Sequence, residues 1–181
     1  MQYLFHNNLD QQVAAIFLAH RSEAGIRVFS IITSFGSWQF LLPVILAIAI
    51  ALFVASKKEF IIPFIATISG AEIITFFGKI LAHRDRPLSA VFHATDFSFP
   101  SGHATIAVAF YGYLAFMLIR IGGNRYKWPI SILACLIAIL IGFSRLYLGV
   151  HYLSDVLAGF MIGLTALVVG IKYIRLADPT K

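Results

Sequence analysis

Long runs of apolar residues, separated by short polar stretches, make up most of this chain of 181 residues. A helix that crosses a membrane needs about 20 mostly apolar residues in succession. Five runs are long enough, and they extend from about Ser37 to Ala55, Phe60 to Leu81, His103 to Ile121, Trp128 to Tyr147 and His151 to Tyr173. The pattern therefore predicts an all-α fold, an integral membrane bundle with five transmembrane helices.

The N-terminal segment, residues 1–34, has a different pattern, because charged residues interrupt its apolar positions. If residues 9–34 formed one span, Arg21, Glu23 and Arg27 would lie inside the membrane, where charges are costly. We predict instead an interfacial amphipathic helix over residues 9–20, followed by an entry into the first span over residues 25–35. An imperfect sixth span is the alternative. The chain is then one membrane-embedded domain, residues 1–181, with a transmembrane core at 37–175.

The composition supports a membrane protein. Hydrophobic residues make up 60% of the chain and charged residues only 12%, whereas soluble domains carry about 25% charged residues. The net charge of +6 fits attraction to anionic lipids, and no soluble basic domain is present that would bind nucleic acid. Cys135 lies inside an apolar run and is predicted to be a buried packing residue. The first residues lack the pattern of a signal peptide, so we expect the first span to direct insertion.

The basic residues between the runs alternate in a way that predicts the orientation. One group falls on the same side of the membrane, namely Lys57, Lys58, Arg120, Arg125, Lys127, Lys172, Arg175 and Lys181. The positive-inside rule places this side in the cytoplasm. The opposite side, with residues 84–101, the turn near 144–151 and the N-terminus, is then expected to face the periplasm or the exterior of a bacterial cell.

Three polar clusters lie on that outer side, although they are far apart in the chain. They read KILAHRDRP (79–87), PSGH (100–103) and SRLYLGVHYLSD (144–155). Lys79, Arg86 and Arg145 place three cations there, and arginine can hold phosphate oxygens with paired hydrogen bonds. For any one of them taken alone, the alternative is that its side chain extends along the apolar surface and places its charge near the lipid phosphates. Three cations on one side favour an anion-binding site.

The second cluster has the features of an anion-binding helix start. Pro100 suits the turn before a helix, and Ser101 suits the N-cap position. Gly102 allows close approach of the backbone to a ligand, and the amide groups of a first helical turn attract anions. His103 would then lie beside the ligand. A helix cap with an incidental histidine is the alternative for this cluster taken alone.

The third cluster contains a histidine and an aspartate four residues apart. On a helix, His151 and Asp155 would share a face and touch. A carboxylate on one imidazole nitrogen leaves the other nitrogen free as a nucleophile. An ion pair at a helix start is the alternative. We predict no metal and no cofactor, because neither a cysteine cluster nor a dense carboxylate set accompanies this pair.

Together the clusters resemble the signature of the type 2 phosphatidic acid phosphatase superfamily, which shares its site with vanadium haloperoxidases. That signature is K-x6-RP, PSGH and SR-x5-H-x3-D. The chain matches every position, with Lys79, Arg86-Pro87, Pro100-Ser101-Gly102-His103, Ser144-Arg145, His151 and Asp155. The motifs cover residues 79–155, and the five apolar runs fit the membrane core of such a protein.

The resemblance implies a role for each matching residue. His151 would attack phosphorus and form a phosphohistidine, Asp155 would orient it, and His103 would protonate the leaving oxygen and later activate water. The phosphoryl oxygens would be held by Lys79, Arg86, Arg145, Ser101 and Gly102. Ser144 would either bind phosphate or shape its turn.

On this basis we predict that the protein is a lipid phosphate phosphatase. Its predicted partners are the lipid phosphate substrate and the surrounding membrane lipids. Its substrate would be undecaprenyl pyrophosphate, since the small chain resembles the bacterial undecaprenyl-pyrophosphate phosphatases of this family, or phosphatidylglycerophosphate, phosphatidic acid or a lipid A phosphate. A lipid-to-lipid phosphotransferase with the same site is the alternative. A transporter of anions or lipids is disfavoured because the spans are apolar, and a haloperoxidase because such enzymes are soluble. The sequence makes no prediction of oligomeric state.

Further residues near the clusters carry weaker expectations. Glu72 lies two helical turns before Lys79, and we expect it to support the bundle or Lys79 rather than catalysis. The stretch 88–99, which contains Phe92, Phe97 and Phe99, forms either a lipid-facing lid or an aromatic anchor at the interface. His83 and His93 flank the phosphate cluster and are expected to be solvated.

Overall fold

The described part of the protein, residues 8–92 and 96–177 of a computed structural model, is built from helices and connecting loops. His93 and Lys181 lie outside the described residues, as does the side chain of Arg175. The helices are α1 (Asn8–Ala19), α2 (Glu23–Ser34), α3 (Trp38–Val54), α4 (Ile61–Ala82), α5 (Gly102–Gly122), α6 (Lys127–Tyr147) and α7 (Leu153–Ala177), with short 3-10 turns at Lys58–Phe60 and Asn124–Tyr126.

Five helical stretches are long and apolar enough to cross a membrane, which confirms the predicted number of spans. The first of them, residues 23–54, joins α2 to α3 through a turn at Phe35–Ser37. Many large apolar side chains on α3 to α7 are exposed, Val54 and Ile62 among them. Such a surface is costly in water but is the expected one in a bilayer.

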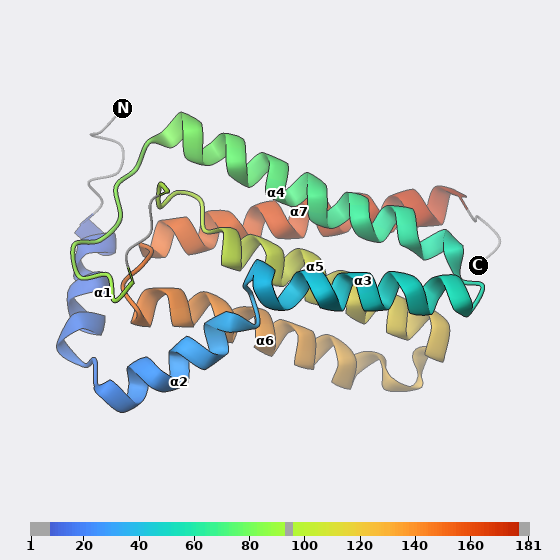
Figure 1. The fold of residues 1–181 in the computed structure, drawn as a ribbon, viewed down its shortest axis with the longest axis horizontal. Coiled ribbons are helices and arrows are strands. Elements are labelled where there is room, and N and C mark those ends of the chain that lie inside the picture. Colours follow the sequence, from blue (N-terminus) through green and yellow to red (C-terminus); the bar gives the residue numbers. More distant parts are fainter. Residues whose placement is uncertain (1–7, 93–95, 178–181) are drawn as a thin grey trace.

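Helices α3 to α7 run roughly side by side along the long axis of the molecule, as Figure 1 shows. Helices α1 and α2 lie at one end, next to the green loop after α4 and the turn between α6 and α7 (Figure 1). The predicted amphipathic helix over residues 9–20 is therefore present as α1, and its position at the membrane interface stays a prediction. The end of the molecule that carries α1 is also the end that carries the three polar clusters.

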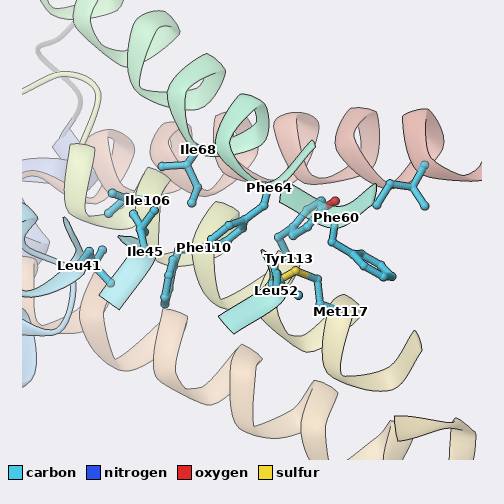
Figure 2. Close-up of a cluster of buried hydrophobic side chains, with 11 residues drawn as sticks. Leu41, Ile45, Leu52, Phe60, Phe64, Ile68, Ile106, Phe110, Tyr113 and Met117 are labelled. Carbon is cyan, nitrogen blue, oxygen red and sulfur yellow. The ribbon is translucent and has the colours of Figure 1, made fainter. Parts of the chain in front are cut away.

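Helix α5 is the centre of the bundle, because it packs against α4, α6 and α7. Its buried residues Ile106, Phe110, Tyr113 and Met117 interdigitate with side chains of α3 and α4, as Figure 2 shows. Eight of the buried positions of this cluster are aromatic or isoleucine side chains, namely Ile45, Phe60, Phe64, Ile68, Ile106, Phe110, Tyr113 and Ile174. This packing fixes where the N-terminus of α5 lies relative to the C-terminus of α4.

Glycine residues bring α7 close to α5. A Cβ atom added at Gly159 would lie 2.6 Å from the carbonyl oxygen of Ser101, and one added at Gly163 would lie 2.5 Å from that of Thr105. Only glycine allows this approach, and pairs of small residues four apart are typical of contacts between membrane helices. The glycine pair therefore holds the start of α7 against the start of α5.

Cys135 departs from its prediction. Its side chain is exposed on α6 rather than buried. An apolar run in a membrane helix contains both lipid-facing and bundle-facing positions, so hydrophobicity alone does not indicate burial.

Candidate active site

The three polar clusters meet at the end of the bundle that carries α1 (Figure 1). Backbone hydrogen bonds join their segments: Ser98 N–H donates to the carbonyl of Arg84 (2.8 Å), and Ser101 N–H donates to that of Asp155 (3.0 Å). Val91 N–H donates to the carbonyl of Leu148 (3.0 Å). The loop between α4 and α5 is thereby tied both to itself and to the α6–α7 turn.

His151 and Asp155 are both buried, and they face each other. His151 Nδ1 lies 3.5 Å from Asp155 Oδ2, and the two side chains are 2% and 0% exposed. The contact that the sequence predicts is present, but its predicted basis is wrong. Helix α7 begins at Leu153, so His151 lies in the turn before the helix and not on it. Asp155 reaches back, and its Oδ2 accepts a hydrogen bond from the Tyr152 amide (2.8 Å).

The second nitrogen of His151 faces the cations. Arg86 Nη1 lies 3.2 Å from His151 Nε2, and because arginine can only donate, Nε2 must accept with its lone pair. The proton of the neutral ring is then on Nδ1, toward Asp155. Burial, and next the positive charges of Arg145, Arg86 and Lys79, hold the pKa of His151 well below its usual range. The imidazole is therefore neutral near pH 7, and its lone pair on Nε2 is directed at Arg86.

Lys79 and Arg86 converge on one carboxylate. Lys79 Nζ lies 3.0 Å from Asp96 Oδ2, and Arg86 Nη2 lies 2.7 Å from Asp96 Oδ1. The two cations are largely buried, whereas Asp96 is 53% exposed. Burial raises the pKa of Asp96, but the hydrogen bonds from Lys79 and Arg86 outweigh it and bring the pKa to about 2. An anionic group thus already occupies the place where the two cations meet.

Arg145 is the most deeply buried of the three predicted cations, and its side chain contacts α2. Its Nη1 donates to Thr33 Oγ1 (2.8 Å), while its Nε is buried and has no partner among the described residues. Its charge and that of Arg86 lie close enough to act on each other. Helix α2 therefore belongs to the site, which the sequence did not indicate.

Ser101 lies at the N-cap position of α5, as predicted, but its hydroxyl makes no capping hydrogen bond. It is fully buried, and its Oγ has no partner within the described part of the chain. A Cβ at Gly102 would meet only ordinary contacts, at 3.8 Å from Thr75 and 3.9 Å from Glu72. Packing within the protein therefore does not require glycine at this position, which leaves the approach of a ligand as its predicted reason.

His103 follows in the first turn of α5, half-buried, and the charges of Arg145, His151, Arg86 and Lys79 all act on it. Ser144 is buried, and its hydroxyl donates to the carbonyl of Ile141 (2.5 Å). Of its two predicted roles, this bond favours the shaping of the α6 end.

Glu72 stands beside the helix start of α5 rather than in an ion pair. Its Oε1 is buried without a partner in the described segments, and Trp38 hydrogen-bonds to its carboxylate. Lys79 pairs with Asp96, although its charge also acts on Glu72. Of the two expected roles, support of the bundle and support of Lys79, the bond to Trp38 favours the first.

Three residues of the site were missed from the sequence. Arg84, predicted only as a basic residue of the outer side, is 5% exposed and binds Asp155 Oδ1 through Nη1 (2.6 Å). Its Nη2 binds Asp10 Oδ2 of α1 (2.8 Å). Ser154 donates to Arg84's partner Asp10 through both its amide (2.9 Å) and its hydroxyl (2.6 Å). No sequence signal identifies these pairings, because Asp10 is one polar residue in an amphipathic helix.

The chemistry of the site suits an anion. Its polar groups are cations, histidines and a helix start, and among residues 8–92 and 96–177 no three His, Cys, Asp or Glu side chains gather as a metal-binding group. A separate cavity of about 680 Å³ lies between α5, α6 and α7, with lining residues such as Gly112, Cys135 and Leu164. No motif residue lines it, so this apolar cavity is not where phosphate chemistry would occur.

A bundle of membrane helices that ends in a cationic site with two histidines is the architecture of an integral membrane enzyme acting on an anionic group. Comparison with known proteins identifies its family. Residues 38–177 match the PAP2 superfamily, and the chain belongs to that superfamily, which confirms the resemblance drawn from the motifs.

The similar proteins are lipid phosphatases. Phosphatidylglycerophosphatase B of Bacillus subtilis strain 168 is 37% identical over 145 residues, which are 74% of this chain and 67% of that protein. The undecaprenyl-diphosphatase BcrC of the same strain is 29% identical over 167 residues, 89% of this chain and 79% of that protein. The crystal structure of a transmembrane PAP2-type phosphatidylglycerolphosphate phosphatase from Bacillus subtilis has a TM-score of 0.92 at 28% identity and covers 99% of this chain and 92% of its own. The chain is thus a membrane phosphatase, a hydrolase of phosphate esters.

Proposed function

We propose that this phosphatase removes phosphate from a phosphomonoester or pyrophosphate of a membrane lipid, through a phosphohistidine and without a metal, at the outer face of a bacterial cell membrane. One observation supports this most directly. Three motif residues keep a buried polar atom without a partner among the described residues: Ser101 Oγ, Arg145 Nε and His151 Nδ1. Each such atom costs about 1–3 kcal/mol. A phosphoryl group would satisfy the first two, and closer contact with Asp155 the third.

In the first step, His151 Nε2 attacks phosphorus while the bond from phosphorus to the leaving oxygen breaks. His103 donates a proton to that oxygen, so the lipid leaves as an alcohol or as a lipid monophosphate. The imidazole gains positive charge as the P–N bond forms, and Asp155 stabilises it through Nδ1–H. The three predicted cations, Lys79, Arg86 and Arg145, offset the charge on the equatorial oxygens.

In the second step, water attacks phosphorus in line with the P–N bond. His103, now neutral, takes a proton from that water. The P–N bond breaks, inorganic phosphate forms, and His151 regains the lone pair on Nε2. The protons balance over the two steps, because His103 gives one and takes one.

The location of the site supports a lipid substrate. The motif residues lie where spans end, and the lateral surfaces of those spans expose large apolar side chains. A lipid can then place its phosphate at Arg86 and Arg145 while its chains stay in the bilayer. The names of the relatives point to two candidates, phosphatidylglycerophosphate and undecaprenyl pyrophosphate. Phosphatidic acid is a third candidate on chemical grounds.

The test uses the purified full chain in detergent with EDTA, with release of inorganic phosphate from these three lipids as the readout. We expect activity in EDTA, and a loss of about 10³-fold or more for His151→Ala. His20→Ala, at an exposed histidine of the same end, is the matched control and should keep full activity.

Two results would contradict the mechanism: activity that survives His151→Ala, and strict dependence on added metal. Acid-labile, base-stable labelling of the chain by substrate carrying ³²P supports the phosphohistidine. Appearance of the label in an added acceptor lipid, rather than in inorganic phosphate, would favour the phosphotransferase instead.

A further inference from the structure

A chain of buried charges continues behind the His151–Asp155 pair. Asp155 Oδ2 faces His151, and Asp155 Oδ1 binds Arg84 Nη1 at 2.6 Å. Arg84 Nη2 then binds Asp10 Oδ2 at 2.8 Å. Asp155, Arg84 and Asp10 are 0%, 5% and 2% exposed. The ring of Tyr152 covers the guanidinium at 4.1 Å. Solvent therefore screens these interactions little, and their charges act on one another strongly.

Asp10 is an unusual residue for its helix. The other side chains of α1 are exposed or half-buried, and Leu9, Ile16 and Leu18 are more than half exposed. Asp10 alone among the described residues of α1 is buried, and both of its oxygens accept hydrogen bonds, from Ser154 and Arg84. Burial raises the pKa of Asp10, but these hydrogen bonds outweigh it and leave the pKa below its ordinary value. Asp10 is therefore an anion at neutral pH.

We propose that Asp10 is a positioning residue of the phosphatase, which acts through Arg84 to keep the Asp155 carboxylate directed at His151. This inference rests on the proposed roles of His151 and Asp155. It makes α1, which lies outside the span of the family match, part of the catalytic apparatus.

The physical reason is the sharing of one cation between two carboxylates. With Asp10 present, Arg84 divides its hydrogen bonds and its charge between Asp10 and Asp155. Without Asp10, Asp155 would be the one carboxylate among the described residues that binds this buried guanidinium, and buried charges that lose a counter-charge are costly. Asp155 would then turn toward Arg84 and away from Nδ1, which is already 3.5 Å distant. The phosphohistidine would form without its stabilising anion.

Loss of the Asp10 charge should weaken phosphate binding less than it slows the chemical step. The cations predicted to hold phosphate bind other residues: Lys79 and Arg86 pair with Asp96, and Arg145 donates to Thr33. Loss of the Asp10 charge should therefore lower kcat and leave KM nearly unchanged. A role of Asp10 as a mere anchor of α1 would lower the melting temperature and would not separate kcat from KM in this way.

The first experiment compares Asp10→Asn with Phe17→Ala in the full chain, with phosphate release from a lipid phosphate in mixed micelles. Phe17 packs α1 on Phe143 and Tyr147, so Phe17→Ala loosens α1 without touching a charge. We expect Asp10→Asn to lower kcat about tenfold or more with KM changed less than about twofold. Phe17→Ala should lower the melting temperature and keep kcat below that temperature.

The pH profile is a second readout. The charged and titratable groups that face His151 are Asp155, Arg86, Arg145, Lys79 and His103. Only the neutral imidazole attacks, so the acid limb of kcat follows protonation of His151. If Asp10→Asn draws Asp155 toward Arg84, the imidazolium loses stabilisation and the limb moves to lower pH. Asp10→Glu, which restores the charge, should return much of kcat.

A double-mutant cycle tests whether Asp10 acts through Arg84. Once Arg84→Met has removed the shared cation, Asp10→Asn should lower kcat by less than about twofold further. The proposal would be overturned if Asp10→Asn lowered kcat by the same factor in the Arg84→Met background as in the original protein. An unchanged kcat in Asp10→Asn alone would also overturn it. Ser154→Ala removes the hydroxyl that donates to Asp10 and accepts from Arg84 Nη1 (2.7 Å), and it should lower kcat by a smaller factor than Asp10→Asn while KM stays nearly unchanged. Survival of activity in His151→Ala would instead overturn the proposed function, so the two failures are distinct.

Discussion

Asp96 pairs with both Lys79 and Arg86, the two cations that the proposed mechanism assigns to the phosphoryl oxygens. Its carboxylate offers two oxygens to two cations, as a phosphate would, and it must leave before a substrate oxygen can bind both. The pair is partly open to solvent, so its strength is modest. At the scale of single residues, then, an internal anion pairs with two of the three predicted phosphate-binding cations.

Asp96→Asn should therefore lower KM for a lipid phosphate, by about two- to tenfold, because the competing charge is gone while the side-chain shape remains. Inhibition by inorganic phosphate should tighten in parallel. The ratio of variant to original KM should be equal at about pH 6 and pH 8, because a pKa of about 2 keeps Asp96 ionised at both. Asp85→Asn, an exposed acid of the same loop, is the control. A raised KM in Asp96→Asn would mean that Asp96 organises the cations instead.

The contact between α5 and α7 is the structural basis of the site at the scale of elements. Gly159 and Gly163 bring the backbones together, and the Ser101 amide bonds to the carbonyl of Asp155 across that contact. The start of α5 carries His103, and the start of α7 carries Asp155. Any separation of the two helices should therefore move the predicted acid away from the predicted nucleophile.

Gly163→Ala tests this dependence. Its Cβ would lie 2.5 Å from the Thr105 carbonyl oxygen, so the helices must separate. Overpacking of this kind costs about 1–3 kcal/mol, and we expect a lower melting temperature together with a lower kcat. Gly70→Ala, in α4 with no atom within 4 Å of the new Cβ, should leave both unchanged or raise the melting temperature, since alanine favours helix. Equal behaviour of the two variants would contradict the packing argument.

At the scale of the whole molecule, basic residues lie at the end opposite the active site. Lys57 and Lys58 precede α4, Arg125 precedes α6, and Lys127 is the first residue of α6. The positive-inside rule therefore supports an active site that faces out of the cytoplasm. Leu88 is fully exposed beside the site, whereas Glu59 is exposed at the opposite end.

Cysteine labelling tests this orientation. In a Cys135→Ala background, Leu88→Cys should react with an impermeant thiol reagent in intact cells, and Glu59→Cys only after the membrane is opened. The background is needed because Cys135 is exposed on α6. The reverse labelling pattern would invert the proposed topology.

Much of the architecture follows from local sequence. The apolar runs predicted the last four spans to within a few residues, because a bilayer imposes length and hydrophobicity on each helix separately, whereas the first candidate span begins at Glu23 rather than Ser37. The spacing within K-x6-RP, PSGH and SR-x5-H-x3-D indicated the family, since each motif is a short stretch at a helix end or at the turn between two consecutive helices. The contact of His151 with Asp155 was likewise predicted, although a turn rather than a helix brings it about.

The identity of the residues that bond to the motif side chains depends on the tertiary structure. Arg145 bonds to Thr33 across 112 positions of the chain, and Ser154 bonds to Asp10 across 144. Asp10, Thr33 and Arg84 carry no local pattern that distinguishes them from solvated residues of a helix or loop. The sequence by itself determined the spans, the motifs and the side of the bundle where they gather. Only the packing of α1 and α2 against that end decided which buried charges meet, because a buried charge is stable only where the fold supplies its counterpart.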